Sequence, residues 1–434
     1  MTPRGRAVGF RAIALAAFAA LLLLSCAPGA PNLPQSPVLK WLERRAGRIA
    51  YVGMDGNVRT MDQAGGSQHE VTSDASVDEN GTGPLYYYQF PAWSPDAKSL
   101  AFVSIRRKGG LLEGSAVWTS TLNGSAPTQV YASNERSASF LSWSPDSSRL
   151  VFVTGRPQGH AQLESVSPHG GEVRVLGTAS GFAWRWEKRG RRIAVHSVDE
   201  DTGSSPGRVG ILDLQGTGHD TDLAGTPGEF DAPAWAPDGT IITAVSDADG
   251  STLYREDSSG GDREPLAHVD GSAVFDLSPD GRHLAWAASP SPGDVVSRSL
   301  YVLDVAARHE SGRLAAVPVS GGDFVAAFFW SPDGQRIAYF VPSGEDSSIA
   351  LKVLTVKSRA VRTVAAFTPS PYYLSLLEEY GQYAESIRVW SPDSRFLLYC
   401  DQGDSSFDVM VAYADAAIAP RKVADGLVAS WSPR

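Results

Sequence analysis

A four-residue motif, Trp-Ser-Pro-Asp or a close variant, recurs through this chain at intervals of 41 to 60 residues. An apolar residue stands seven places after the start of the motif, as Leu100 does after Trp93 and Ile337 does after Trp330, so the repeats share one register. Self-similarity at such a period indicates one supersecondary unit, repeated until the hydrophobic faces of its copies cover each other. Six clear copies start at Trp93, Trp143, Trp235, Leu277, Trp330 and Trp390, and two degraded copies start at Trp186 and Trp431.

Each repeat predicts four antiparallel strands. In the motif, Pro fixes φ at the first turn position, Asp bonds its own backbone, and the Gly that often follows accepts a positive φ, which together predict a hairpin turn. A short apolar run such as residues 100–103 follows as a second strand. Residues 300–304 and 361–364 are typical third and fourth strands. Four antiparallel strands of this kind form the blade of a β-propeller.

The two ends of the repeat array complement each other. The first repeat starts at its second strand, in residues 47–51, and the last stops after its first strand, in residues 427–433. Pairing Val428 to Ser432 with Ile49 to Val52 completes one blade and removes two open sheet edges. With eight first strands and eight second strands, the sequence predicts an all-β fold: an eight-bladed β-propeller of four-stranded antiparallel blades, closed by pairing the C-terminal strand with the N-terminal three strands.

The repeats resemble those of TolB-like β-propellers, in which a Trp-Ser-Pro-Asp-Gly turn is followed by an Ile-Ala-Phe strand. They are also similar to the propeller of dipeptidyl peptidase IV-type enzymes. The resemblance spans residues 47–434 and implies the fold, whereas such propellers serve as periplasmic scaffolds, substrate gates and occasionally lyases. Because the chain leaves no room for the hydrolase domain of dipeptidyl peptidase IV-type enzymes, we expect no peptidase activity.

The N-terminal segment reads as an export signal. Three arginines precede the apolar run Ala12 to Leu24, which is shorter than the roughly 20 residues that a membrane-spanning helix needs. Leu23-Leu24-Ser25-Cys26 resembles a bacterial lipobox, which implies lipidation of Cys26; an ordinary signal peptide with an incidental cysteine is the alternative. We therefore expect a signal peptide over residues 1–25, a lipidated Cys26 and flexible tether over 26–46, and a single propeller domain over 47–434. The protein is then exported and lipid-anchored to the bacterial cell envelope, outside the cytoplasm.

Composition and motifs give little sign of catalysis. The formal net charge of −10 disfavours nucleic acid and anionic lipid surfaces as partners. Gly203 to Gly207 match the letters of a nucleophile elbow, but a strand-like segment follows where a helix is required. The eight histidines have no metal-ligand spacing, and Asp247 to Gly250 begin like a calcium loop without the acid needed at Ser258. We expect no cofactor, no metal site and no enzymatic activity.

Length variation is confined to one face of the predicted disc, where the second-to-third strand loops and the blade-to-blade crossovers lie. Variable loops on a rigid scaffold commonly carry binding. Two crossovers, residues 73–90 and 368–388, carry inserted aromatic residues. In the second, apolar side chains spaced i, i+3, i+4 and i+7 from Tyr373 predict a short amphipathic helix. This helix could either pack over a neighbouring blade or recognise a partner. The expected contacts are Tyr87, Tyr88, Tyr373, Tyr380 and Tyr383.

Acidic residues gather in loops of the same face. Asp199, Asp247 and Asp401 represent them, and they predict a negative field that suits a cationic peptide, an amine or a metal-bearing ligand. Arg106-Arg107-Lys108 is the exception on this rim. The sequence therefore predicts a lipid-anchored, non-catalytic propeller that binds a protein or peptide partner through its variable-loop face. The alternatives are a metal-assisted polysaccharide lyase or hydrolase acting at the propeller channel, and a purely architectural component of the envelope.

Overall fold

The structure is a computed structural model of the full chain. It describes residues 47–77, 85–122, 124–156, 159–198, 207–216, 220–228, 231–248, 250–269, 271, 273–288, 299–305, 324–343, 348–379, 381, 385–415 and 417–434. The predicted signal peptide, the lipidation of Cys26 and the tether over 26–46 lie outside the described residues.

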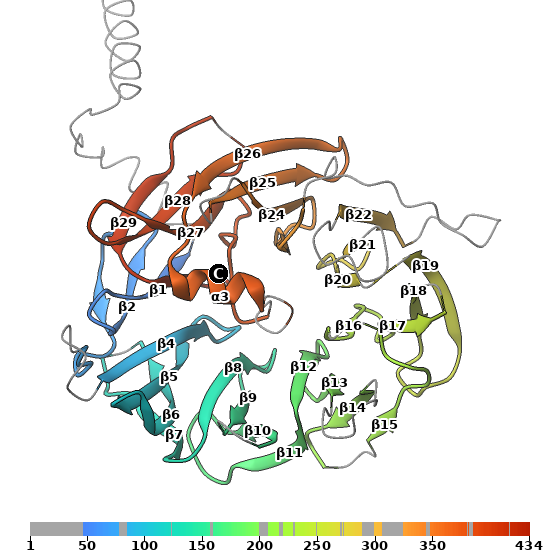
Figure 1. The fold of residues 1–434 in the computed structure, drawn as a ribbon, viewed down its shortest axis with the longest axis horizontal. Helices are drawn as coiled ribbons and strands as arrows, with labels where there is room; N and C mark the ends of the chain where they lie inside the picture. Colours follow the sequence, from blue (N-terminus) through green and yellow to red (C-terminus); the bar gives the residue numbers. More distant parts are fainter. Residues whose placement is uncertain are drawn as a thin grey trace, which may run out of the picture. The chain divides into compact units, whose positions relative to one another are not determined.

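Eight antiparallel sheets follow one another around a ring in the order of the chain (Figure 1). We name them blades A to H. Blade A contains β1 (Arg48–Val52), β2 (Val58–Asp62), β3 (His69–Glu70) and β30 (Val428–Trp431). Blade B contains β4 (Leu85–Trp93), β5 (Ser99–Lys108), β6 (Leu111–Thr121) and β7 (Thr128–Ser133). Blade C contains β8 (Ser137–Trp143), β9 (Leu150–Gly155), β10 (Ala161–Val166) and β11 (Arg174–Ala179). Blade D contains β12 (Gly181–Trp186), β13 (Arg192–Val198), β14 (Arg208–Asp213) and β15 (Thr221–Asp222).

The second half of the ring repeats the plan. Blade E contains β16 (Ala234–Trp235), β17 (Ile241–Asp247), β18 (Gly250–Glu256) and β19 (Arg263–Val269). Blade F contains β20 (Ala273–Leu277), β21 (His283–Ala288) and β22 (Ser299–Asp304), and the segment that follows β22 lies outside the described residues. Blade G contains β23 (Ala327–Trp330), β24 (Arg336–Pro342), β25 (Ile349–Thr355) and β26 (Ala360–Phe367). Blade H contains β27 (Phe396–Gln402), β28 (Phe407–Tyr413) and β29 (Arg421–Asp425), and its first strand is reduced to a bridge between Trp390 and Leu397. The prediction of eight blades is confirmed.

Ring closure follows the predicted register. Strand β30 pairs antiparallel with β1, with Ile49 opposite Trp431 and Val52 opposite Val428. The pairing continues one residue further, where the backbone N–H of Ser432 donates to the carbonyl of Arg48 over 2.7 Å. The N-terminal three strands and the C-terminal strand thus form one sheet, and neither β1 nor β30 is left as an open edge at this seam.

The motif turn is held by its own side chains. In blade B, the Ser94 hydroxyl donates to Asp96 Oδ1 over 2.6 Å and accepts from the backbone N–H of Ser99 over 2.9 Å. Asp96 Oδ1 also accepts from the backbone N–H of Lys98 over 3.0 Å. The residue after the Asp takes a positive φ, which is 67° at Gly334 and 60° at Ala97. Ser and Asp therefore recur because they bond the turn, and Gly is preferred after them because of that φ.

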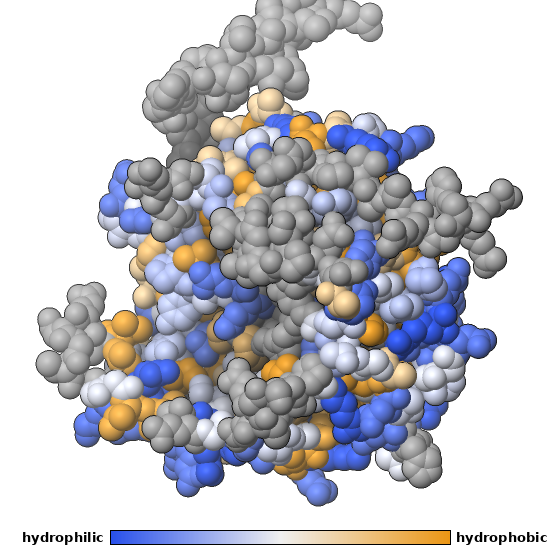
Figure 2. Space-filling model, turned by 45° about the vertical axis from the view of Figure 1, so that its right-hand side comes forward, coloured by the Kyte–Doolittle hydropathy of each residue, from blue (hydrophilic) through white to orange (hydrophobic). Residues whose placement is uncertain are grey.

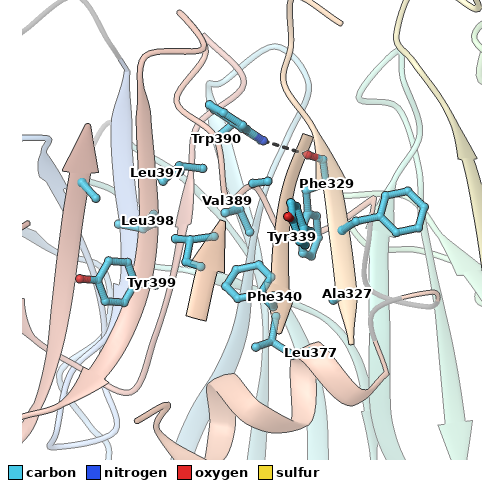
Figure 3. Packing of buried hydrophobic residues seen from close by; sticks show 14 of the residues in the cluster. Ala327, Phe329, Tyr339, Phe340, Leu377, Val389, Trp390, Leu397, Leu398 and Tyr399 are labelled. Carbon is cyan, nitrogen blue, oxygen red and sulfur yellow. Dashed lines mark hydrogen bonds between the residues drawn. The ribbon is translucent and has the colours of Figure 1, made fainter. Parts of the chain in front are cut away.

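In five of the blades the motif tryptophan bonds to a backbone carbonyl of the blade before it. In blade H, the Trp390 indole N–H donates to the carbonyl of Phe329 in blade G over 2.9 Å (Figure 3). The Arg336 guanidinium of blade G lies over the same indole, 5.3 Å from the ring centre. The same indole-to-carbonyl bond joins Trp93 to Ser430, Trp143 to Ala92, Trp235 to Arg185 and Trp330 to Asp276. In each case the acceptor is the residue just before the motif's first position in the preceding blade.

One helix packs over the ring. Helix α3 (Pro371–Glu378) starts after Ser370, whose hydroxyl accepts from the backbone N–H of Tyr373 over 3.1 Å, and it lies over the middle of the ring in Figure 1. Leu377 points into the apolar cluster shared by blades G and H (Figure 3), whereas Leu376 joins the cluster of blades A and B. The predicted helix is confirmed, and its apolar stripe packs as core.

The face drawn in Figure 2 carries both hydrophilic and apolar residues. Among the coloured atoms of Figure 2, apolar residues form patches that hydrophilic residues separate. No helix in the described part of the chain has the length and apolar character needed to cross a bilayer.

Candidate functional site

Two of the tyrosines predicted as contacts, Tyr88 and Tyr373, have buried side chains. Tyr88 is 3% exposed and its hydroxyl donates to Asp74 Oδ1 over 2.7 Å. Tyr373 is 1% exposed, its hydroxyl donates to the carbonyl of Leu398 over 3.2 Å, and burial raises its pKa well above the usual value. Tyr88 packs in the apolar cluster of blades A and B, and Tyr373 packs in the cluster of blades G and H. As folded, these two side chains contribute to the core. Tyr380 and Tyr383 lie outside the described residues.

A different pair of tyrosines reaches the surface. Tyr87, the neighbour of Tyr88, is half-buried and lies edge-to-face against Tyr372 of α3, with ring centres 6.4 Å apart. Burial and the adjacent Tyr87 hydroxyl raise the pKa of Tyr372 to about 12, so it remains a neutral phenol at physiological pH. Both rings are partly exposed: Tyr87 packs against the apolar cluster of blades B and C, and Tyr372 packs against that of blades A and B. Tyr372 was not predicted from the sequence.

Blade B extends beside this pair. Its strands β5 and β6 have 10 and 11 residues, whereas the second strands of the other blades have 5 to 7. The basic residues at the end of β5 are exposed, and Leu111 just beyond the hairpin turn is 75% exposed. The Arg106 guanidinium lies 5.2 Å from the centre of the Tyr86 ring. We define the loop-face surface by Tyr86, Tyr87, Arg106, Arg107, Leu111 and Tyr372.

The predicted acidic rim is not assembled among the described residues. Asp247 ends β17 of blade E, where it accepts from the Thr252 hydroxyl over 2.9 Å and lies 3.4 Å from His268 Nδ1. Asp401 belongs to blade H and accepts from the backbone N–H of Thr368 over 3.2 Å; burial raises its pKa. The two carboxylates therefore bond to different local partners and do not meet. Asp199 lies outside the described residues.

A cluster of charged side chains joins the first strands of blades D and F to the crossover before blade H, and sequence reasoning missed it. Arg185 and Asp231 are buried, whereas Asp276 and Glu385 are half-buried. Arg185 on β12 forms an ion pair with Asp276 on β20. Asp231 is buried beside them and accepts from the backbone N–H of Phe275 over 2.9 Å. Glu385, from the crossover that precedes blade H, accepts from the backbone N–H of Trp186 over 3.3 Å. The available signal was a charged residue just before the motif's first position, since Arg185 and Asp276 stand where other copies have Ala, Ser, Phe or Val.

Burial controls the protonation of this cluster. It raises the pKa of Glu385 to about 7 and that of Asp231 to about 6, and it also raises the pKa of Asp276, although Arg185 opposes all three shifts. Burial lowers the pKa of Arg388, which lies near Glu385. Glu385 and Asp231 therefore take up protons near neutral pH, because burial disfavours their charged forms more than Arg185 stabilises them.

A cavity of about 290 Å³ opens onto this cluster on the face of the motif turns. Its walls include Trp235, Pro237 and Pro279, and its polar lining comes from Arg185, Lys188, Asp276 and Glu385. Within the described ranges, no three His, Cys, Asp or Glu side chains are grouped so that they could hold a metal ion. The Cys400 thiol is buried, and burial raises its pKa far above the usual value, so it is a structural thiol rather than a nucleophile.

No protein-family model matches the chain, and no curated protein does. Solved structures do match. An oligogalacturonate lyase in complex with manganese shares 14% identity at a TM-score of 0.51, over 85% of this chain and 96% of the lyase. The β-propeller domain of the trilobed protease from Pyrococcus furiosus, which has an open velcro topology, shares 12% identity at a TM-score of 0.50, over 79% of this chain and 96% of that domain. TolB from Acinetobacter baumannii shares 15% identity at a TM-score of 0.40, over 77% of this chain and 85% of TolB. At these identities the likeness is one of fold: the chain is a β-propeller similar to those of proteins with several different activities.

Proposed function

We propose that this protein is a lipid-anchored, extracytoplasmic β-propeller that binds an acidic segment of a protein or peptide partner through the loop-face surface, without catalysing a reaction. The observation that carries the proposal is the extension of blade B, which presents exposed basic and apolar side chains beside the Tyr87–Tyr372 pair. Anchoring rests on the lipobox-like sequence that ends at Cys26.

The composition of the loop-face surface suits protein recognition. Tyrosine and arginine are enriched among the residues that dominate binding energy in protein interfaces, because they combine a large contact area with directional polar groups. Here the half-buried rings are already held against each other, so little conformational freedom is lost on binding. Leu111 adds an exposed apolar side chain at the hairpin.

Charge selects the class of partner. Arg106, Arg107 and Lys108 are exposed and adjacent, and Glu113 is the one exposed acidic residue in β5 and β6. On a chain with a formal net charge of −10, this local positive field favours an acidic segment over a basic one. A partner that inserts carboxylates between the arginines and packs an apolar residue on Leu111 would use both features.

A site-specific photo-crosslinker tests the surface directly. Placed at Leu111 in the full-length, membrane-bound protein, it should trap one partner, whereas the same group at Val175 should not. Val175 is a matched control because it is also exposed, at 50%, on a strand of blade C.

Charge reversal gives the quantitative test. With the trapped partner purified, Arg106→Glu combined with Arg107→Glu should weaken its binding about tenfold or more, since each charge-assisted contact contributes roughly 1 kcal/mol or more. Melting temperature should change little, because both side chains are exposed. Crosslinking that is equal at positions 111 and 175 would contradict the proposal. So would an unchanged affinity, and a stoichiometric divalent metal in the purified protein would favour the lyase alternative.

Anchoring has its own test. Cys26→Ser should abolish incorporation of a fatty-acid label and release the protein from the membrane fraction, while leaving the affinity of the purified propeller for its partner unchanged. Membrane retention of the variant without label would contradict the lipid anchor and leave the binding proposal standing.

A further inference from the structure

The contact between blades E and F lacks a ring that other blade contacts have. Leu277 stands at the first position of the motif in blade F, where the other five clear copies have tryptophan. A cavity of about 160 Å³ lies beside Leu277, between the motif turns of blades E and F. Where the tryptophan is present, as at Trp390, its indole bonds to the preceding blade. The cavity therefore lies at the one clear copy of the motif that has no indole.

Most residues that line the cavity are apolar. Ile242 and Leu277 are buried, and Val305 is half-buried. Pro237, from the motif turn of blade E, also lines the cavity and is exposed, so the cavity opens to the surface on the face of the motif turns. An engineered cavity of about 150 Å³ with apolar walls binds benzene. The cavity between blades E and F therefore has the size and the walls to take an aromatic ring.

A guanidinium faces the motif tryptophan at two other blade contacts. Arg192 of blade D lies 5.0 Å from the ring centre of Trp235 in blade E. Arg336 of blade G lies 5.3 Å from the ring centre of Trp390 in blade H. In both contacts the arginine starts the second strand of its blade and the ring belongs to the next blade. A cation over the face of an aromatic ring attracts it, and the attraction is strongest for indole.

The contact between blades E and F keeps such a cation. Arg255 on β18 lines the cavity, and its guanidinium donates to the Thr240 hydroxyl over 3.0 Å. Thr240 has the register position of Arg336, one residue before the residue that pairs with the motif tryptophan. Arg255 also forms an ion pair with Asp238, the aspartate of its motif turn, as Arg336 does with Asp333. A guanidinium is therefore held at this contact as at the others, although it comes from the third strand of the blade.

We propose that the cavity between blades E and F is a second ligand site, which binds a neutral aromatic ring of up to indole size beside Arg255. The ring leaves water for apolar walls, and the guanidinium adds a contact with its face. An anionic ligand is disfavoured because Asp238 and Asp280 line the same cavity. The site lies on the face of the motif turns, so it is independent of the function proposed for the loop-face surface.

Fluoroindole tests the site, because indole is the ring that this contact lacks. Added to the full-length protein in detergent and followed through its fluorine resonance, it should bind one site per chain with a dissociation constant of about 1 mM or tighter. Leu277→Trp fills the cavity with a ring of the protein itself and should weaken binding about tenfold or more. Arg255→Met keeps an unbranched apolar stem, removes the charge and should weaken binding about threefold.

Arg192→Met is the matched control for Arg255→Met. The two arginine side chains are 31% and 32% exposed, and each forms an ion pair within its own blade. Arg192 differs in that it faces a ring already present, that of Trp235. Its replacement should therefore leave the affinity for fluoroindole unchanged.

A tryptophan tripeptide identifies the source of the ring. If Gly-Trp-Gly displaces fluoroindole from wild type, the site takes a tryptophan side chain of a peptide. If fluoroindole binding is lost in Leu277→Trp but the tripeptide does not displace it from wild type, the site takes a free aromatic compound.

Three results would overturn the aromatic site. One is the absence of binding to wild type at about 10 mM fluoroindole. Another is unchanged binding in Leu277→Trp, which would place the probe elsewhere on the protein. The third is an equal effect of Arg255→Met and Arg192→Met, and this comparison decides alone if Leu277→Trp does not fold.

Discussion

The sector of blades G, H and A and the sector of blades D, E and F use the same repeat and fill the ring axis differently. Just before the motif tryptophan, the first sector has Phe329 and Val389, which belong to the largest apolar cluster. The second has Arg185 and, before Leu277, Asp276. The indole bonds to a backbone carbonyl, so the seam does not depend on which side chain its partner carries. The residue just before the motif's first position can therefore be charged without breaking the indole bond.

The largest effect is expected from disrupting the apolar contact between blades G and H, in the first sector. Trp390→Ala removes a buried indole, its bond to Phe329 and the surface on which Arg336 lies, and it should lower the free energy of unfolding by about 4 kcal/mol. Denaturant unfolding measures this loss. Trp390→Leu, which copies the residue found at Leu277, should cost less than the alanine. Equal losses for the two variants would show that the indole N–H and the cation contact, rather than apolar volume, hold the seam.

Removing the Arg185 charge from the second sector should lower the free energy of unfolding by about 3 kcal/mol at pH 8. Arg185→Met keeps the length of the side chain and leaves Asp276, Asp231 and Glu385 without their shared cation, and removing one partner of a buried pair is expensive. The loss should be smaller at pH 5.5, where the carboxyl groups take up protons. Lys188→Met changes an exposed residue of the same cavity and should stay within about 0.5 kcal/mol. If Arg185→Met lost the same stability at pH 8 and pH 5.5, Arg185 would not stabilise the protein by neutralising the carboxyl groups.

The pH dependence of stability distinguishes the sectors next. Glu385 and Asp231 have folded-state pKa values of about 7 and 6, above their ordinary values, so the folded protein holds their protons more tightly than the unfolded chain. Stability should fall as pH rises from 5.5 to 8, by about 2 kcal/mol. The slope should be visibly shallower in Glu385→Gln when both proteins are unfolded in the same buffers. Parallel profiles would assign the pH response to other groups.

The smallest effect is expected from repairing the irregular seam. Leu277 occupies a tryptophan position and borders the cavity of about 160 Å³ between blades E and F. Leu277→Trp should fill part of that space and bring an indole N–H towards the carbonyl of Ala234, for a gain of up to about 1 kcal/mol. Thermal unfolding would register it as a small rise in melting temperature. A loss greater than 1 kcal/mol would mean that the cavity walls do not yield to the larger ring.

The fold was predictable because its determinants are local. The Ser and Asp of each motif bond their own turn, and the missing strands of the two chain ends complement each other. The site was not predictable for two reasons. Tyr87 is half-buried and Tyr88 is buried, although they are neighbours on one strand, because their side chains pack against different apolar clusters. Arg185 and Asp276 are 91 residues apart and Trp186 and Glu385 are 199 apart, so only the closed ring brings them together.

The pairing of β1 with β30 constrains the order of assembly. Until residues 428–431 are synthesised and pair with β1, that strand has an unpaired edge that includes Ile49 and Tyr51. Blades B to H precede β30 in the chain and are synthesised before this edge is covered. Contacts this distant along the chain are slow to form, and a waiting strand edge invites pairing with another molecule. A newly made chain is therefore most vulnerable to association with its neighbours just before its last strand arrives, and a chaperone that shields β1 would be most useful at that moment.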